Sequence, residues 1–154
     1  MISRTEMAQR HQSSPDQQIP AREIIYLACP YTHPDSKVRE RNFRTATEAA
    51  AVLIREGHIV YSPITMTHPI DVVIAGTTAT LGSDYWVAFD EAFMDACSEI
   101  VILKVEGWDT SSGIRREMEY FKKQGKPIRF MSPAQLPTSS ADGSDTEGPK
   151  IQSR

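Results

Sequence analysis

Apolar and polar residues follow two different periods along the chain, and the changes of period predict its elements. Segments of strand length rich in apolar residues occur at 24–28, 58–62, 100–105 and 128–131, and the first is a continuous apolar run, as is typical of buried strands in parallel sheets. Between them, apolar or small residues recur at helical spacing over 36–56, 84–98 and 112–124. This alternation predicts an α/β fold: a Rossmann- or flavodoxin-like, three-layer domain around a four- or five-stranded parallel sheet.

Residues 64–83 show no clear period. They include Pro69, Gly76 and Gly82, which predict a long irregular connection of the kind that often forms a lid or a binding loop. Both ends of the chain are polar, with few aliphatic residues. We therefore expect flexible tails at 1–22 and 133–154 around one folded domain at 23–132.

Composition narrows the expected partners and compartment. A formal net charge of -3 gives no electrostatic case for binding a nucleic acid polymer. No apolar run is long enough to cross a bilayer, and the first residues lack the apolar core of a signal peptide. Cys29 and Cys97 have no metal-ligand spacing and predict free thiols in a reducing compartment. We expect a cytoplasmic protein without a membrane partner.

Candidate chemistry concentrates at 108–119, WDTSSGIRREME, between a predicted strand and a predicted helix. Ser111 or Ser112 is placed to cap the helix, and Gly113 permits close backbone approach, so the free N–H groups and positive helix end suit an anion. Glu117 lies beside the apolar stripe of the helix. We expect it to lean toward the sheet and to stay ionised, as a nucleophile must, with a solvated helix glutamate as the alternative.

Other chemical candidates are fewer. In the helix before the third strand, Asp90 follows Trp86 by four residues, which predicts a carboxylate beside an aromatic wall, with a solvated helix face as the alternative. His33 and His68 each precede a proline and are expected to be ordinary loop histidines. No Walker A, Gly-x-Gly-x-x-Gly or Gly-x-Ser-x-Gly motif occurs.

Three motifs taken together resemble the nucleoside 2-deoxyribosyltransferase superfamily. The first is Ile-Tyr-Leu-Ala at 25–28 followed by Pro-Tyr at 30–31, and the second is Gly-His-Ile-Val at 57–60 followed by Ser-Pro at 62–63. The third is Ser-x-Gly-x-x-x-Glu at 111–117, followed by Gly-Lys-Pro at 125–127. The chain is most similar to small members of the superfamily that resemble nucleoside 5'-monophosphate N-glycosidases.

The resemblance implies cleavage of an N-glycosidic bond through a glycosyl-enzyme intermediate. Glu117 matches the nucleophile that attacks the anomeric carbon. Asp90, or Glu91 if the register shifts by one residue, matches the carboxylate that assists the departing base. Tyr26 matches the tyrosine that orients the nucleophile. No cofactor and no metal are implied.

Position 111 bears on the substrate. Members that hydrolyse nucleoside 5'-monophosphates resemble this chain in having serine there, whereas base-exchanging transferases tend to carry an aspartate, which would repel a phosphate. We expect Ser111, Gly113 and Arg39 to hold the phosphate, and Tyr31 or Trp86 to stack on the base.

Pro30 and Ser112 are expected to line the same substrate site. The sequence thus predicts hydrolysis of a nucleoside 5'-monophosphate by a homodimer or homotetramer whose partner is a small-molecule nucleoside or nucleotide. Exchange of bases between deoxynucleosides is one alternative, and a non-catalytic nucleotide-binding module is the other.

Overall fold

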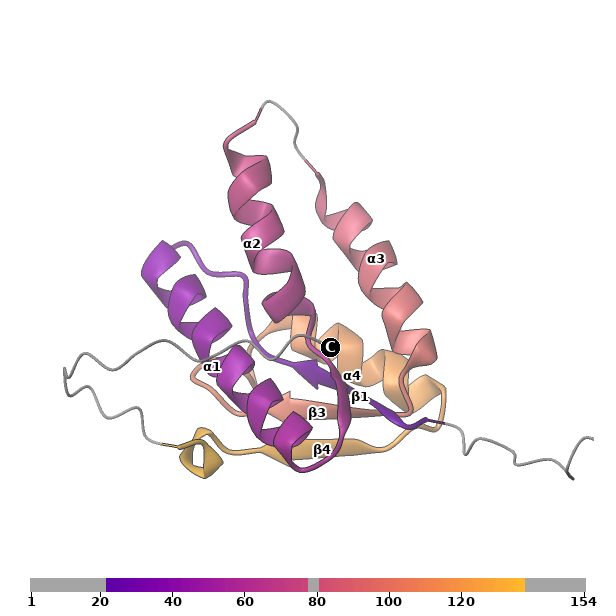
Figure 1. Ribbon diagram of the computed structural model, residues 1–154. Coiled ribbons are helices and arrows are strands. Elements are labelled where there is room, and N and C mark those ends of the chain that lie inside the picture. Colours follow the sequence, from indigo (N-terminus) through magenta and orange to yellow (C-terminus); the bar gives the residue numbers. More distant parts are fainter. Residues whose placement is uncertain (1–21, 78–80, 138–154) are drawn as a thin grey trace, which may run out of the picture.

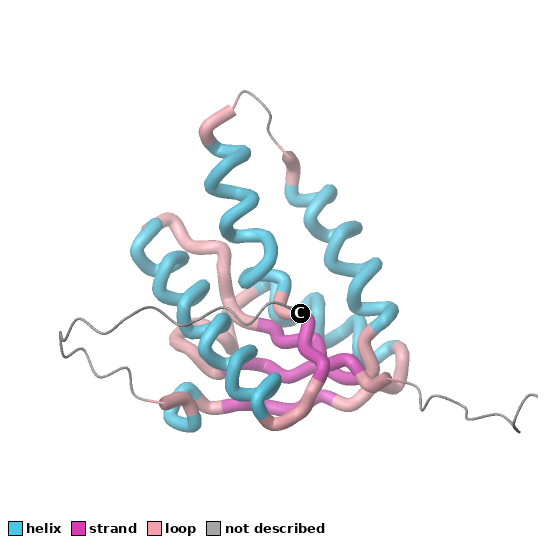
Figure 2. The backbone as a smooth tube through the Cα atoms, in the orientation of Figure 1, coloured by secondary structure: helices cyan, strands magenta, loops and turns pink. Residues whose placement is uncertain are grey.

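A computed structural model describes residues 22–77 and 81–137 of the chain (Figures 1 and 2). In chain order the elements are β1 Ile24–Ala28, α1 Ser36–Arg55, β2 Ile59–Tyr61, α2 Pro63–Ala75, α3 Ser83–Ala96, β3 Glu99–Leu103, α4 Ser112–Lys123, β4 Ile128–Met131 and the 3₁₀ turn η1 Pro133–Gln135. The predicted tails lie mostly outside the described residues. The turn η1 lies just beyond the domain end predicted at residue 132.

The four strands form one parallel sheet in the order β2-β1-β3-β4. β1 pairs with β3 in a register that places Leu27 opposite Val101, and both strands are buried along almost their whole length. Successive strands pass from one side of β1 to the other, so the strand order reverses between β1 and β3. In open α/β sheets, ligands bind beyond the carboxyl ends of the strands at such a point.

Helices cover both faces of the sheet, which gives the predicted three layers (Figure 2). Ile25 and Leu27 pack in one core cluster with buried residues of α1 and the first turn of α2. Tyr26 and Ala28 pack in a second cluster with residues of α3 and α4. Because successive side chains of a strand point to opposite faces, Tyr26 is directed toward α4.

The prediction of an irregular connection at 64–83 is wrong over most of its length, because Pro63–Ala75 is the helix α2. Its N-cap Ser62 is extended and Pro63 occupies the first turn, where a missing N–H costs nothing. Pro69 lies inside the helix and removes one backbone hydrogen bond. Proline and threonine argue against a helix here, and the apolar residues of α2 lie on several faces, so they show no helical period in the sequence. The link at 78–80 lies outside the described residues.

The other predicted elements are present, with ends that differ by at most two residues, as is usual for helix and strand boundaries. α1 begins at its N-cap Asp35, whose side chain accepts a hydrogen bond from the Lys37 N–H at 2.8 Å. The chain leaves α1 through Gly57, whose φ of 93° favours glycine. No helix among residues 22–77 and 81–137 is long and apolar enough to cross a membrane.

Candidate active site

A buried carboxyl group and a buried phenol meet between the sheet and α4. The Tyr26 hydroxyl donates a hydrogen bond to Oε1 of Glu117 at 2.9 Å. Tyr26 is fully buried on the central strand β1, and Glu117 is only 8% exposed. Glu117 shares the buried face of α4 with Ile114 and Phe121, so it is not a solvated helix glutamate. The rings of Tyr61 and Phe121 pack against Tyr26 and hold the phenol in one orientation.

An acidic partner reaches this pair from α3. Asp90 is half-buried, and its Oδ2 lies 3.8 Å from Nη2 of Arg116, which directly precedes Glu117 on α4. Its charge raises the pKa of both Glu117 and Tyr26, which places it within electrostatic range of them. Glu91 instead acts on Tyr120, so of the two acidic residues left open by the sequence, Asp90 is the one that faces the buried carboxyl.

Burial dominates the electrostatics of these groups. It raises the pKa of Glu117 to about 8, although the hydrogen bond from Tyr26 acts in the opposite direction. Burial also raises the pKa of Asp90 to about 6, and Arg116 partly offsets this. The expectation of a Glu117 kept ionised by the helix end is therefore wrong, because desolvation of the carboxylate outweighs the helix dipole. The pKa of Tyr26 lies far above its usual range, so the phenol acts only as a donor to Glu117.

A cavity of about 310 Å³ opens above Glu117 at the carboxyl edge of the sheet. Its walls are the loop after β1, including Pro30 and Tyr31, and the start of α4 at 111–113. Ser111 caps α4, since its Oγ accepts a hydrogen bond from the Ile114 N–H at 3.3 Å. The structure therefore gathers Glu117 and the predicted binding residues Pro30, Tyr31, Ser111, Ser112 and Gly113 around one space.

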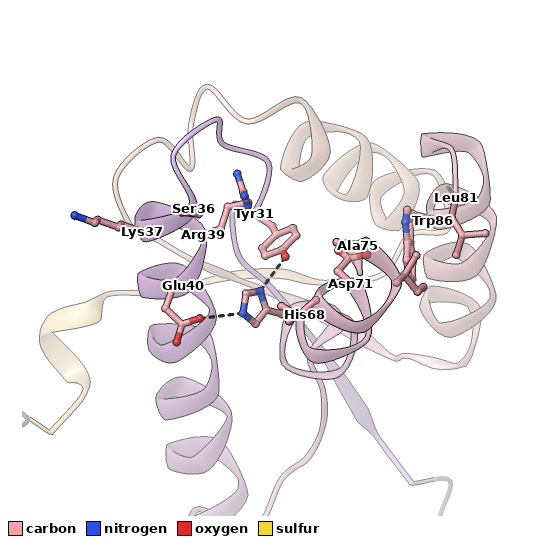
Figure 3. A pocket seen from close by; sticks show the side chains of 12 residues that line it. Tyr31, Ser36, Lys37, Arg39, Glu40, His68, Asp71, Ala75, Leu81 and Trp86 are labelled. Carbon is pink, nitrogen blue, oxygen red and sulfur yellow. Dashed lines mark hydrogen bonds and ion pairs between the residues drawn. The ribbon is translucent and has the colours of Figure 1, made fainter. Parts of the chain in front are cut away.

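Arg39 and Trp86 lie elsewhere. Both line a second, larger hollow of about 770 Å³ between α1, α2 and α3 (Figure 3). Nη1 of Arg39 donates hydrogen bonds to the carbonyls of His33 and Pro34, so this cation braces the loop after β1 and does not line the cavity above Glu117. Tyr31 lines both spaces and therefore stands at their boundary.

Sequence reasoning missed a polar cluster in this hollow. His68 is predicted to be a loop histidine, but it lies on α2, where Nδ1 is 2.9 Å from the Tyr31 hydroxyl and Nε2 is 3.0 Å from Oε2 of Glu40. Asp71, one turn further along α2, lines the same space. Only the helical assignment of α2 brings these residues together, and Pro69 obscured that helix. The spacing of His68 and Asp71 by three residues is the one signal present.

Comparison with solved structures finds a 2-deoxyribosyltransferase from the psychrotolerant bacterium Bacillus psychrosaccharolyticus, described as a biocatalyst for the industrial synthesis of antiviral and antitumoral nucleosides. The two chains are 24% identical, the alignment covers 71% of this chain and 72% of the other, and the TM-score is 0.51. The comparison shows that the two proteins share their fold.

Sequence comparison with functionally characterised proteins gives no significant match. A family model described as a domain of unknown function, DUF1937, matches residues 23–133. Because this match spans more than half of the chain and includes every described helix and strand, the protein belongs to the DUF1937 family.

Proposed function

We propose that the protein breaks the N-glycosidic bond of a nucleoside or nucleoside 5'-monophosphate, with Glu117 as the nucleophile. The observation that carries the proposal is the buried Tyr26–Glu117 hydrogen bond of 2.9 Å at the edge of a cavity, with Asp90 within electrostatic range. Two carboxyl groups in different environments are the usual equipment for attack on an anomeric carbon and protonation of its leaving group. The fold shared with a 2-deoxyribosyltransferase supports the same class of chemistry.

In the proposed first step, a carboxylate oxygen of Glu117 forms a bond to C1' of the sugar. The bond from C1' to the base nitrogen breaks, and its electron pair leaves with the base, which takes a proton from Asp90. With pKa values near 6 and 8, the two carboxyl groups hold one proton between them near neutral pH. The reactive arrangement places that proton on Asp90 and leaves Glu117 ionised, with Tyr26 stabilising the charge.

In the second step, either a second nucleobase or water takes the sugar from Glu117. The activity named for the structural neighbour supports base exchange. In that case a second nucleobase attacks C1', the bond from C1' to the Glu117 oxygen breaks, and Asp90 takes the proton of the incoming base. The start of α4 supports hydrolysis of a 5'-monophosphate: Ser111 and Ser112 border the cavity at a positive helix end, and no carboxylate at 111 repels a phosphate. In that case water attacks C1', the bond from C1' to the Glu117 oxygen breaks, and a proton of the water goes to Asp90.

The remaining predicted residues receive roles on the same basis. We propose that Gly113 allows a phosphate to approach the backbone, because a Cβ there would meet only Ser111 Oγ, at 3.8 Å. The fold itself therefore does not require glycine at this position. Pro30 and Tyr31 border the sugar, and Trp86 offers a stacking surface to the base in the larger hollow. Arg39 acts by holding the loop after β1.

The test is incubation of the protein with a panel of nucleosides and their 5'-monophosphates, with and without a second free base, followed by chromatography. Free base and free sugar phosphate identify hydrolysis, whereas a new nucleoside identifies exchange. Glu117→Gln should reduce either activity by about three orders of magnitude or more, while the exposed control Glu119→Gln should retain it. A folded protein that binds these compounds but turns over none of them would contradict the proposal in favour of a binding module.

A further inference from the structure

We propose that the larger hollow selects nucleobases that carry an exocyclic amino group, with Asp71 and the Tyr31 hydroxyl as the selecting acceptors. This inference rests on the proposed function and names the substrate class of that same site. It predicts that adenine- or cytosine-type substrates react in preference to their keto counterparts. The contacts that carry it lie on the loop after β1, on α1 and on α2 (Figure 3).

The hollow is in the right place to receive the base. Tyr31 borders both this space and the cavity above Glu117. On α3, Trp86 lines the hollow and lies one helical turn before Asp90, which interacts electrostatically with Glu117. A base whose sugar lies at Glu117 therefore extends past Tyr31 toward Trp86. A volume of about 770 Å³ lies within the range of small-molecule sites.

The first acceptor is fixed by the hydrogen bonds around His68. The Glu40 carboxylate can only accept a hydrogen bond, so Nε2 of His68 carries the proton between them. The ring of Phe43 stacks on the imidazole, with centroids 4.4 Å apart. The Tyr31 hydroxyl has a single proton. That proton goes either to His68 Nδ1, at 2.9 Å, or to Asp71, which raises the pKa of Tyr31 by charge and hydrogen bonding. In both arrangements only the oxygen lone pairs of Tyr31 remain for a ligand.

The second acceptor is the carboxylate of Asp71, which lies beside Tyr31 in the hollow (Figure 3). The two cations that line the same space, Arg39 and Lys37, are not directed at the Asp71 carboxylate. Nη1 of Arg39 donates to backbone carbonyls, and the exposed Lys37 side chain points away from the hollow (Figure 3). The polar wall formed by Tyr31 and Asp71 therefore offers acceptors, which an amino group satisfies by donating.

A base with a keto group in place of the amino group would present a hydrogen-bond acceptor to this wall. Its carbonyl oxygen would face the oxygens of Tyr31 and Asp71, so two acceptors would meet without a proton between them. Sites that bind a ligand through hydrogen bonds discriminate strongly against analogues that leave their polar groups unpaired. Because this hollow is partly open to water, we expect a preference of about 10- to 100-fold, below that of a fully enclosed site.

The experiment compares kcat/KM for base release within two pairs, adenosine with inosine 5'-monophosphate and cytidine with uridine 5'-monophosphate. The amino member of the pair that the protein accepts should be favoured by the factor given above. Asp71→Asn replaces one acceptor oxygen by an amide donor, so it should reduce or reverse the preference. Asp84→Asn, at an exposed position in the first turn of α3, is the matched control and should leave the preference unchanged.

Binding separates a failure of this inference from a failure of the proposed function. Calorimetric titration of Glu117→Gln with the same four nucleotides measures selectivity without turnover, and the same preference should appear in Kd. Equal affinity for amino and keto partners, or a preference that survives Asp71→Asn, would overturn the inference even if the enzyme is active. Selective binding without any base release from the wild-type protein would support the inference and contradict the proposed function. Circular dichroism of Asp71→Asn verifies that the variant is folded.

Discussion

At the scale of single residues, the distinguishing feature is a carboxyl group that the fold buries against a phenol. Tyr26 donates to Glu117 from a fully buried position, and this hydrogen bond lowers the pKa that burial has raised. The phenol thus makes the ionised nucleophile more accessible near neutral pH. Its ring also packs between Tyr61 and Phe121, which a phenylalanine would preserve.

Tyr26→Phe should therefore isolate the hydroxyl. Without its hydrogen bond, the pKa of Glu117 rises further, and the transition state loses a charge-assisted contact. We expect kcat/KM to fall by about 10- to 100-fold. The pH at which activity falls to half its maximum on the alkaline side should move upward, because the last proton of the Asp90–Glu117 pair leaves near the pKa of Glu117. An unchanged pH profile, with a folded variant, would show that Tyr26 has only a packing role.

The two carboxyl groups predict a bell-shaped pH profile. With pKa values of about 6 and about 8 at Asp90 and Glu117, the singly protonated pair is most populated between these values, and kcat/KM should fall on either side. Asp90→Asn removes the proton donor and leaves only the ionisation of Glu117, so the alkaline decline should disappear while overall activity drops. Substrates with activated leaving groups should lose less activity, because they need less help from an acid.

Ionisation of the buried Glu117 carboxyl group should also lower the free energy of unfolding as the pH rises above the acidic range. Its folded-state pKa of about 8 lies above the value for an unfolded glutamate, so the folded state binds the proton more tightly. Stability is then lost as the pH rises from about 4 toward 8. Glu117→Gln has no charge to bury, and Tyr26 can still donate to its amide oxygen. The variant should be more stable than the wild type by roughly 1–3 kcal/mol at pH 8 and by little at pH 4.

Chemical denaturation at the two pH values measures this difference. Glu119→Gln, on the exposed side of the same helix, supplies the control for a change in helix propensity and net charge. A Glu117→Gln variant with no stability gain at pH 8 would show that the carboxylate is better solvated than its burial indicates.

At the scale of elements, the start of α4 combines two functions in one residue. Ser111 caps the helix through its Oγ and borders the cavity above Glu117. Ser111→Ala should lower the free energy of unfolding by about 1 kcal/mol, because the cap is lost. Ser111→Asp should keep the cap, since aspartate is an equally good N-cap residue, but should place a negative charge where we propose the phosphate.

The two substitutions therefore separate capping from substrate choice. The ratio of kcat/KM for a nucleoside 5'-monophosphate to that for the nucleoside should fall by about tenfold or more in Ser111→Asp. In Ser111→Ala the ratio should change less, although stability falls more. A ratio unaffected by aspartate would remove the phosphate from this end of α4 and favour the transferase alternative.

Most of the helices and strands can be predicted from the sequence, and the exceptions have a physical cause. The four strands and three of the helices follow from apolar runs and helical spacing, because each buries a regular face. Parallel topology then places the ends of β1 and β3 at one edge, and the pairing of Tyr26 with Glu117 comes from the resemblance to the superfamily. The helix α2 does not follow from the sequence, because Pro69 and the threonines argue against a helix locally, and without that helix the sequence does not predict the cluster around His68. The pKa of Glu117 does not follow from the sequence, because the burial of its carboxyl group against Tyr26 arises from packing between α4 and the sheet.

At the scale of the whole molecule, α2 and α3 project beyond the rest of the domain (Figure 1). They carry a group of exposed apolar side chains, with Val72 61% and Val73 70% exposed on α2 and Tyr85 50% exposed on α3. Exposed apolar side chains that form a continuous patch are typical of association surfaces. The same helices frame the hollow to which we assign the base. We therefore propose that a second copy of the chain covers this surface and gives a homodimer or a homotetramer.

Val73→Glu tests the assembly, because it places a charge at the most exposed of these positions and should not disturb the core. We expect sedimentation velocity to show an oligomer for the wild type and a smaller species for the variant. Ile54→Glu is the matched control: Ile54 is 56% exposed on α1, away from the α2–α3 surface, so its variant should remain assembled. If assembly shapes the hollow, Val73→Glu should also raise KM without an equal change in the pH profile, since the buried Tyr26–Glu117 pair lies within one chain. A wild-type monomer at micromolar concentration would contradict the assembly and leave α2 and α3 as a surface for some other use.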